Sequence, residues 1–216
     1  MTKRNVAAEL AAIGRRFYER GWVLGTSGNF SAVVSRQPLR LAITASSLPK
    51  GTLRASDILQ CDENGRVVGR GKGKPSAETL LHVEIARRRS AGAVLHTHSV
   101  WSTMLSDTWP SGAGNDAAGV PGIVIQGYEM LKGLAGVTSH EHRELTPIVD
   151  NDQDMTRLAR RVGETLERHP AAHAFLLRRH GLYTWGDTLA DAERHVEILE
   201  FLFETIGRMQ GGPSWR

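Results

Sequence analysis

Strand-like segments in this 216-residue chain come in pairs joined by short turns, and helical segments interrupt the series without strict alternation. The first pair covers residues 31–35 and 39–44, and the second covers 57–62 and 66–69 on either side of an Asn-Gly turn. Asn-Gly between apolar runs favours a β-hairpin, whose strands are antiparallel. A doubly wound parallel sheet instead needs a helix after each strand. The pattern therefore predicts an α/β chain with a mixed or antiparallel sheet.

Apolar residues at helical spacing predict an opening helix over 6–17 that docks one face on the core. Further helices are expected over 78–86, from near 151 to 166, and over 187–206, and further strands over 93–98, 123–126, 145–149, 174–177 and 182–185. Ser76 is expected to cap the helix that follows it. Residues 106–122 are rich in Gly, Ala, Ser, Asp and Pro and predict a loop. No repeat, linker or domain break interrupts the sequence, so we expect one domain over residues 1–216.

The composition excludes disordered and membrane-spanning proteins. Hydrophobic residues make up 40% of the chain and charged residues 23%, which is too apolar for disorder. No run approaches the roughly 18 apolar residues that span a bilayer. Residues 1–16 carry charges between single apolar positions, so we expect no export signal. A single cysteine, Cys61, fits a reducing compartment, and we expect a cytoplasmic protein in which any zinc is bound by histidine.

The net charge leaves the class of ligand open. There are 27 Lys and Arg residues against 23 Asp and Glu residues, a difference of +4. Such an excess fits an anionic small molecule as well as nucleic acid. The basic stretch 69–74 has no aromatic residues between its charges, so bases have nothing to stack on there. We expect a small-molecule ligand, with neither nucleic acid nor a membrane as a partner.

Two histidines, His96 and His98, stand two residues apart at the end of a predicted strand. That spacing places both imidazoles on one face, where they can chelate one metal ion. Two polar residues on a hydrated strand face are the alternative. A catalytic zinc site with an open position needs three protein ligands. His180 is the candidate for the third, because Gly181 beside it permits close approach; a core or surface histidine beside two arginines is the alternative.

The six other histidines lie in polar loops or on helix faces, where we expect solvated side chains. They are His82, His140, His142, His169, His173 and His195.

Three turns rich in hydroxyl groups and backbone N–H groups suit a phosphate. Residues 25–29, Gly-Thr-Ser-Gly-Asn, resemble an anion nest, although a strand-entry turn explains them about as well. Residues 44–47 add hydroxyls after a strand, and residues 74–76 set a lysine beside a helix N-terminus. Together the three turns favour an anion-binding site.

Two glutamates are candidates for a general acid or base. Glu129 follows a predicted strand and opens an apolar turn, so it can project into a cleft. Glu78 lies at the start of a predicted helix. For both residues, a helix N-terminal glutamate stabilised by the helix dipole is the alternative.

Five motifs, taken in order, carry a family resemblance across nearly the whole chain: GTSGNFS at 25–31, ITASS at 43–47, PSAE at 75–78, HTHS at 96–99 and RHGL at 179–182. This set resembles the class II aldolase/adducin family. The resemblance implies a three-layer α/β/α fold with a central mainly antiparallel sheet, in a homotetramer with active sites near subunit boundaries. It implies one zinc ion per subunit, held by His96, His98 and His180. The implied phosphate cradle and substrate-binding residues are Gly28, Asn29, Ser46, Ser47, Ser76 and Glu78.

Within the family, residues 127–133, 151–155 and 178–186 resemble the dehydratase branch of methionine salvage. The implied reaction is the zinc-dependent dehydration of 5-methylthioribulose 1-phosphate to 2,3-diketo-5-methylthiopentyl 1-phosphate, catalysed by a hydro-lyase. The dehydratases place the catalytic acid/base where Glu129 stands, whereas that of the aldolases resembles Glu78. Ala77 departs from a serine often found in the aldolases' phosphate cradle.

Several alternatives stay open at this point. A sugar-phosphate aldolase that performs retro-aldol cleavage is the nearest, and a non-catalytic adducin-like binding module is another. Three imidazoles also accept iron, cobalt or manganese. Tyr128, Met130 and Trp101 are candidates for a pocket that takes the methylthio group, with ordinary core packing as the alternative.

Overall fold

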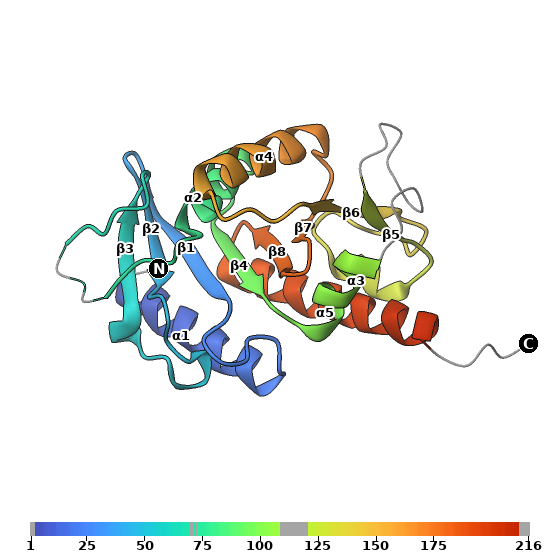
Figure 1. Cartoon of the computed structure of the whole chain (residues 1–216), viewed down its shortest axis with the longest axis horizontal. Helices are drawn as coiled ribbons and strands as arrows, with labels where there is room; N and C mark the ends of the chain where they lie inside the picture. Colours follow the sequence, from blue (N-terminus) through green and yellow to red (C-terminus); the bar gives the residue numbers. More distant parts are fainter. Residues whose placement is uncertain (1–2, 70, 72, 109–120, 212–216) are drawn as a thin grey trace, which may run out of the picture.

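The computed structural model describes residues 3–69, 71, 73–108 and 121–211. Over that part of the chain eight strands form one sheet in the order β3-β2-β1-β4-β8-β7-β6-β5 (Figure 1). Neighbouring strands are antiparallel except for the β6–β7 pair. The strands are β1 (Asn29–Arg36), β2 (Leu39–Thr44), β3 (Ile58–Asp62), β4 (Ala93–Thr97), β5 (Gly122–Ile125), β6 (Glu144–Val149), β7 (Ala174–Leu177) and β8 (Gly181–Gly186).

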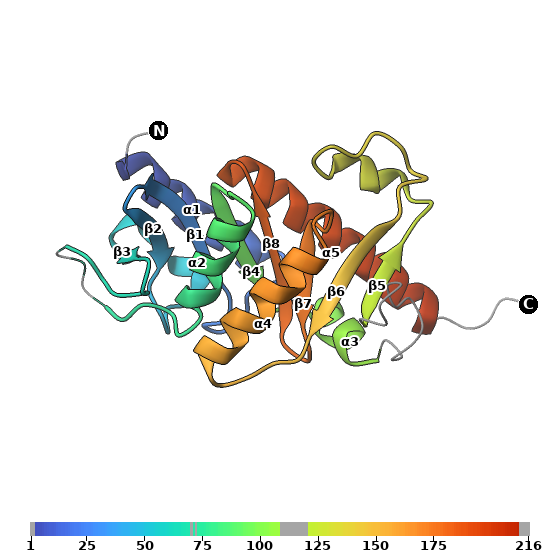
Figure 2. The same cartoon turned by 90° about the horizontal axis from the view of Figure 1, so that it is seen from above.

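Helices cover both faces of this sheet (Figure 2). They are α1 (Lys3–Glu19), α2 (Thr79–Arg88), α3 (Val100–Thr108), α4 (Met155–Arg168) and α5 (Leu189–Gly211), together with the 3₁₀ helices η1 (Lys50–Thr52), η2 (Ala55–Asp57) and η3 (Glu129–Gly133). Phe175 and Tyr183 pack under α2 and α4, whereas Leu176 and Leu182 pack under α3, α5 and η3. Successive strand residues point to opposite faces, so each strand supplies both cores. The expected three-layer fold with a mainly antiparallel sheet is confirmed.

Residues predicted to carry the chemistry lie at the C-terminal end of β4. This strand lies between β1 and β8, and its register pairs His96 with Asn29 on β1 and with Tyr183 on β8. The backbone N–H of His98 donates to the carbonyl of Trp22 at 2.8 Å. That bond holds the residue after the strand against the loop that leads into β1.

Most expected elements are present, but some boundaries differ. Ser76 is not the N-cap residue of α2: Glu78 takes that position without a side-chain cap, and its N–H donates to Ser76 Oγ at 3.2 Å. The helix expected from near 151 begins only after Asp154, whose side chain accepts the N–H of Arg157. Beyond the Asn-Gly turn, Val67 forms a single bridge to Cys61 instead of a strand. At both helix starts a side-chain oxygen, of Ser76 or of Asp154, accepts a backbone N–H group near the boundary.

Helix α3 is missing from the sequence-based expectations. Its start signal is Ser99, whose Oγ accepts the N–H of Ser102 at 3.1 Å, and Trp101 and Leu105 place apolar groups one turn apart on the core. The loop expected over 106–122 falls mostly outside the described residues. Among the helices that are described, none is long and apolar enough to cross a membrane.

Candidate active site

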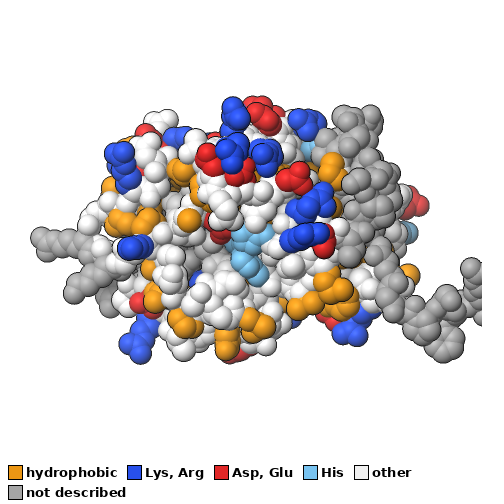
Figure 3. Space-filling view, viewed as in Figure 1, with side chains coloured by type: hydrophobic (Ala, Val, Ile, Leu, Met, Phe, Trp, Pro, Cys, Tyr) orange, Lys and Arg blue, Asp and Glu red, His pale blue; other side chains and the backbone are white. Residues whose placement is uncertain are grey.

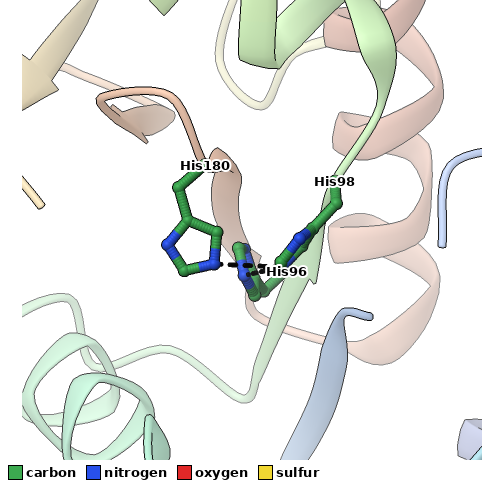
Figure 4. Close-up of side chains that lie close together, drawn as sticks. All are labelled: His96, His98 and His180. Atoms are coloured by element: carbon green, nitrogen blue, oxygen red, sulfur yellow. Dashed lines mark hydrogen bonds between the residues drawn. The ribbon is translucent and has the colours of Figure 1, made fainter. Parts of the chain in front are cut away.

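Three imidazoles from distant parts of the chain converge at the end of β4 (Figure 4). His98 Nε2 lies 2.7 Å from His96 Nε2 and 3.1 Å from His180 Nε2. His96 is buried, and the other two are partly exposed. The structure therefore brings together the two histidines of the strand motif and the candidate chosen as their third partner. We call these three residues the histidine trio.

Local backbone structure orients the imidazole rings of the trio. His96 Nδ1 donates to the carbonyl of Leu182 at 2.8 Å, so the lone pair of its Nε2 faces the other two rings. Arg179 adopts a left-handed conformation with φ of 55°, which turns the chain between β7 and β8 and returns His180 toward β4. Gly181 is required next to it, because a Cβ there would overlap the carbonyl oxygen of Thr97.

The electrostatics of the trio suit a cation. Burial, followed by the charges of His98 and His180, lowers the pKa of His96 well below its usual value, and burial lowers the pKa of His98 to about 3. Neutral rings with three converging Nε2 atoms leave lone pairs opposed. The buried Nδ1 of His180 also has no hydrogen-bond partner within the described part of the chain. Three imidazole ligands with an open fourth position are a donor set that zinc accepts, so these residues fit a divalent metal ion.

Glu78 brings a carboxylate to the edge of the trio. Its Oε1 lies 3.3 Å from His180 Nε2, and its Oε2 lies 3.6 Å from His96 Nε2. Asn29 Nδ2 donates to Glu78 Oε2 at 2.6 Å and to Ser76 Oγ at 3.2 Å. The bond from Asn29 holds the carboxylate beside the Nε2 atoms of the trio, within reach of a molecule bound there.

A buried histidine orients Asn29 from below. His82 Nε2 contacts Asn29 Oδ1, and His82 Nδ1 lies 2.7 Å from Ser31 Oγ. Burial lowers the pKa of His82 to about 3, so the ring is neutral and donates from one nitrogen only. Donation to Asn29 Oδ1 makes Ser31 the donor at the other nitrogen and turns the Asn29 amide nitrogen toward Glu78.

A pocket of about 280 Å³ opens beside the trio, and Gly28, Ser46 and Ser76 line it together with His98 and His180. Figure 3 shows histidine side chains at the middle of this face. The backbone N–H of Ser46 donates to the carbonyl of residue 74 at 2.9 Å. The turns 44–47 and 74–76 therefore lie side by side, and both adjoin the loop 25–29 at the pocket. Asn29 lies buried beneath it and Ser47 is exposed next to Ser46.

Lys50 lies buried beneath two of these turns. Its Nζ donates to the carbonyl oxygens of Thr26 and Leu48, both at 2.9 Å. Burial lowers the pKa of Lys50 to about 8. The ammonium group ties the loop 25–29 to the turn that ends at Leu48 and adds positive charge under them. Sequence reasoning missed Lys50, because a lysine in a loop is ordinarily exposed.

Asn151 and Gln153, in the loop between β6 and α4, also line the pocket, as does Met155 at the start of α4. Only the family resemblance had drawn attention to this stretch. Within the described residues, the candidates for a methylthio pocket lie elsewhere: Trp101 packs against the core between α3 and α5, and Tyr128 Oη donates to Met209 Sδ at 3.3 Å.

Glu129 lies apart from the trio within one chain. It opens η3, which packs on the α5 face of the sheet, whereas His96 stacks on Tyr183 on the opposite, α2/α4 face. In Figure 2, η3 is the short helix, without a label, on the connection that leads from β5 to β6. The Glu129 side chain is 73% exposed and pairs with Lys132 at 2.7 Å. The hydrogen bond and the charge of Lys132 lower the pKa of Glu129.

The expectation of six solvated histidines is wrong for four of them. His82, His169 and His195 are buried, and the side chain of His173 is only 15% exposed. The rings of His82, His173 and His195 bond to backbone groups or to polar side chains of other elements. Polar neighbours in the sequence therefore say little about the exposure of a histidine.

Comparison with known sequences gives a consistent picture. A sequence model of the family described as Class II Aldolase and Adducin N-terminal domain matches residues 8–206. The methylthioribulose-1-phosphate dehydratase of Methylococcus capsulatus is 49% identical over 207 residues, covering 95% of this chain and 94% of that protein. The protein of the same name from Pseudomonas fluorescens is 44% identical over 205 residues, covering 94% and 93%.

Solved structures share the fold. YgbL from Escherichia coli, described as a putative aldolase/epimerase/decarboxylase, superposes with a TM-score of 0.77 at 25% identity, covering 98% of this chain and 92% of that one. An L-fuculose 1-phosphate aldolase gives a TM-score of 0.74 at 23% identity, covering 97% and 89%. The second likeness shows the fold alone, because one fold hosts many activities.

Proposed function

This chain belongs to the class II aldolase and adducin family, and on that premise we propose that it removes water from 5-methylthioribulose 1-phosphate to give 2,3-diketo-5-methylthiopentyl 1-phosphate. The activity is that of a hydro-lyase in methionine salvage. Relatives named methylthioribulose-1-phosphate dehydratase, 42% to 49% identical over most of the chain, support it. The observation that carries the proposal is the convergence of His96, His98 and His180 beside a pocket rich in hydroxyl groups.

The trio is proposed to hold one zinc ion per subunit through its three Nε2 atoms. A divalent ion in that position supplies Lewis-acid polarisation of a ketone oxygen, which acidifies the neighbouring C–H bond. The protein's own contribution is orientation. The bond from His96 Nδ1 to the carbonyl of Leu182 fixes the His96 ring. The close contact of Gly181 with Thr97 on β4 fixes the position of His180.

The hydroxyl-bearing turns are proposed to bind the phosphate. Gly28, Ser46 and Ser76 line the pocket, and Asn29 and Ser47 stand next to them. Backbone N–H groups and hydroxyls are suitable donors for phosphate oxygens, and the buried Lys50 adds positive charge below. Binding the phosphate at one end of the substrate would fix the reacting carbons relative to the trio.

Glu129 is the proposed acid/base. Dehydration breaks the C3–H bond and the C4–O bond and leaves a C3=C4 enol, which becomes the diketone when the proton of the C3 hydroxyl is lost and C4 gains one. Glu129 either takes the C3 proton or gives a proton to the departing C4 hydroxyl. Because Glu129 lies on the other face of the sheet from the trio of its own chain and is 73% exposed, we assign it to the site of a second copy in a homotetramer. Its exposure in one chain supports a role at a boundary between copies.

Mass spectrometry of the reaction products tests the proposal. Purified, zinc-loaded protein incubated with 5-methylthioribulose 1-phosphate should give one product that is lighter by one water and retains the phosphate. A chelator should abolish the product, and added zinc should restore it. If the substrate stays intact with zinc present, the proposed function is wrong.

The position of Glu78 favours retro-aldol cleavage as a second candidate function. Its carboxylate lies 3.3 Å from His180 Nε2, where it can move a proton on a molecule bound at the trio. Cleavage would yield two fragments, of which one carries phosphate, so the same mass spectrum separates the two reactions. A chain that binds no metal would instead support an adducin-like binding module.

The proposal covers the whole of residues 1–216 as one domain. The single sheet within the described residues and the family match over 8–206 support that organisation. A cytoplasmic location is also part of the proposal, and the single buried cysteine, Cys61, fits a reducing compartment.

A further inference from the structure

A second cluster of ionisable side chains lies where β6, β7 and the segment after η3 meet. Glu144, at the start of β6, is 1% exposed. Its Oε2 lies 2.8 Å from His142 Nε2 and 2.9 Å from His173 Nδ1, and its Oε1 accepts the backbone N–H of His173 at 3.0 Å. Both oxygens of this buried carboxylate therefore have N–H donors.

His173 has an acceptor at each ring nitrogen. Nδ1 faces Glu144 Oε2, and Nε2 lies 2.8 Å from the carbonyl oxygen of Ala135. An imidazole donates from both nitrogens only when it is protonated. Burial lowers the pKa of His173, but the hydrogen bond and charge of Glu144 outweigh it, and the net shift is upward. His173 and Glu144 therefore form a buried ion pair that reaches Ala135.

A second histidine holds the same residue from the other side. His195 Nδ1 donates to the carbonyl of Trp185 at 2.7 Å, so its Nε2 is free to accept the backbone N–H of Ala135 at 3.0 Å. Burial lowers the pKa of His195, in keeping with a neutral ring. His173 therefore bonds to the carbonyl oxygen of Ala135, and His195 bonds to the N–H of the same residue. The ring centroids of His173 and His195 are 5.5 Å apart.

The segment that these hydrogen bonds hold in place is the end of η3. Arg194 Nε donates to the carbonyl of Gly133 at 2.9 Å, and a Cβ on Gly133 would overlap the side chain of Ile198 on α5. At the other end of the same short helix, the Glu129 side chain is 73% exposed. The backbone of η3 is thus tied down on several sides, while its glutamate projects into solvent.

We propose that Glu144 and His173 are positioning residues for Glu129: their ion pair fixes Ala135, and through it η3, so that the carboxylate of Glu129 stands at a set place when it enters the site of a second copy. This inference rests on the proposed function, which makes Glu129 the acid/base. A proton-transfer group must be held within a fraction of an ångström of its working position, and a surface helix of five residues has little rigidity of its own.

The surroundings of His173 define the cluster's charge balance. The groups that face it are Glu144 on β6, His142 before β6, His195 on α5 and Arg89 at the end of α2. Glu144 is the single anion among them. Its replacement by glutamine removes the partner that keeps His173 charged, at almost no change in size, and is therefore the substitution of choice.

The test compares the zinc-loaded wild-type enzyme with Glu144→Gln. We expect kcat to fall roughly tenfold or more, as displaced catalytic groups do, with KM and inhibition by inorganic phosphate unchanged. Hydrogen exchange at residues 131–137 should quicken. In a Glu129→Gln background, Glu144→Gln should cost no further turnover, because it acts through Glu129. Glu164→Gln on α4, an exposed glutamate 4.0 Å from Arg160, is the matched control and should change nothing.

Each contrary outcome is distinct. An active Glu144→Gln enzyme with kcat within twofold of wild type overturns the positioning role, as does an equal loss in the Glu129→Gln background. A second metal ion per chain that Glu144→Gln removes also overturns it, because the cluster would then be a metal site. If Glu144→Gln fails to fold, His173→Gln replaces it, since an amide cannot donate at both positions. An inactive wild-type enzyme would refute the proposed function itself.

Discussion

Which ring nitrogen is engaged decides what each histidine does. His96 gives Nδ1 to a carbonyl and presents Nε2 to the trio, whereas His173 has acceptors at both nitrogens. Strand alternation alone predicted that His96 and His98 share a face. It could not predict the roles of His82 or His173, because their partners Ser31 and Glu144 lie 51 and 29 residues away. Residue roles that depend on distant partners stay hidden in one sequence.

Lys50→Met should weaken phosphate binding. The substitution removes the ammonium group that donates to the carbonyls of Thr26 and Leu48 and that supplies the positive charge below the turns. We therefore expect KM to rise about tenfold, equivalent to about 1.4 kcal/mol. Metal content should stay at the wild-type value. Steady-state kinetics and inhibition by inorganic phosphate measure the effect, with Arg160→Met, an exposed residue on α4, as the control. An unchanged KM and phosphate inhibition would remove Lys50 from the binding site.

At the scale of elements, the periodicity of apolar residues predicted the helices and strands that core packing stabilises. The opening helix, the paired strands and the closing helix carry apolar residues at the spacing that their buried faces require. Boundaries set by side chains were less visible, as with Asp154 at the start of α4 and Ser99 before α3. Family resemblance, more than local pattern, grouped the site residues in the sequence, because three turns far apart along the chain meet only after the sheet has formed.

Gly181→Ala should disturb the metal site through the backbone. The added Cβ overlaps the carbonyl oxygen of Thr97, so β8 must move away from β4 and carry His180 with it. We expect zinc affinity to fall by roughly tenfold or more, as measured by competition with a chelator. Gly163→Ala is the control, because its Cβ would meet the flexible ends of the Glu84 and Arg88 side chains, with no backbone atom among its nearest contacts. Wild-type affinity in Gly181→Ala would show that the close contact does not position His180.

The ion pair between β6 and the residue before β7 should make stability depend on pH. The pKa of His173 is raised from 6.5, so its stabilisation is complete below 6.5 and is lost as pH rises through the raised value. The pKa of Glu144 is lowered from 4.5, because its bonds to His173 outweigh burial, so its stabilisation is present above 4.5 and is lost as pH falls through the lowered value.

The free energy of unfolding of wild type should therefore exceed that of Glu144→Gln by the largest amount, about 2 kcal/mol, between pH 4.5 and 6.5. The difference should shrink as pH rises above 6.5 through the raised pKa of His173. Urea unfolding of the zinc-loaded proteins, within this pH window and above it, measures the difference. A difference that is the same at every pH would show that His173 is not charged in the folded protein.

At the scale of the whole molecule, the trio and Glu129 lie on opposite faces of one sheet. The proposed tetramer would complete a catalytic arrangement that needs both, because a second copy could bring its Glu129 to the trio. The sequence contained the proposed parts of the site but not their proposed division between chains, because no local pattern says which copy a side chain serves.

Hybrid tetramers test the division. His96→Ala should lose metal and turnover, and Glu129→Gln should keep metal and lose turnover by about 10²-fold to 10⁴-fold. Co-expression of the two variants should restore up to about a quarter of wild-type activity, because some sites then combine an intact trio with an intact glutamate from a neighbour. Hybrids with no more activity than the separate variants would place the acid/base within the same chain as the trio.

X-ray absorption at the zinc edge tests the central claim most directly, namely that His96, His98 and His180 hold one divalent ion. Wild-type protein should bind one zinc per chain with three imidazole nitrogens at about 2.0 to 2.1 Å, and a His96→Ala, His180→Ala double variant should bind none at this site. A wild-type spectrum without imidazole ligands, or full zinc binding by the double variant, would contradict the account.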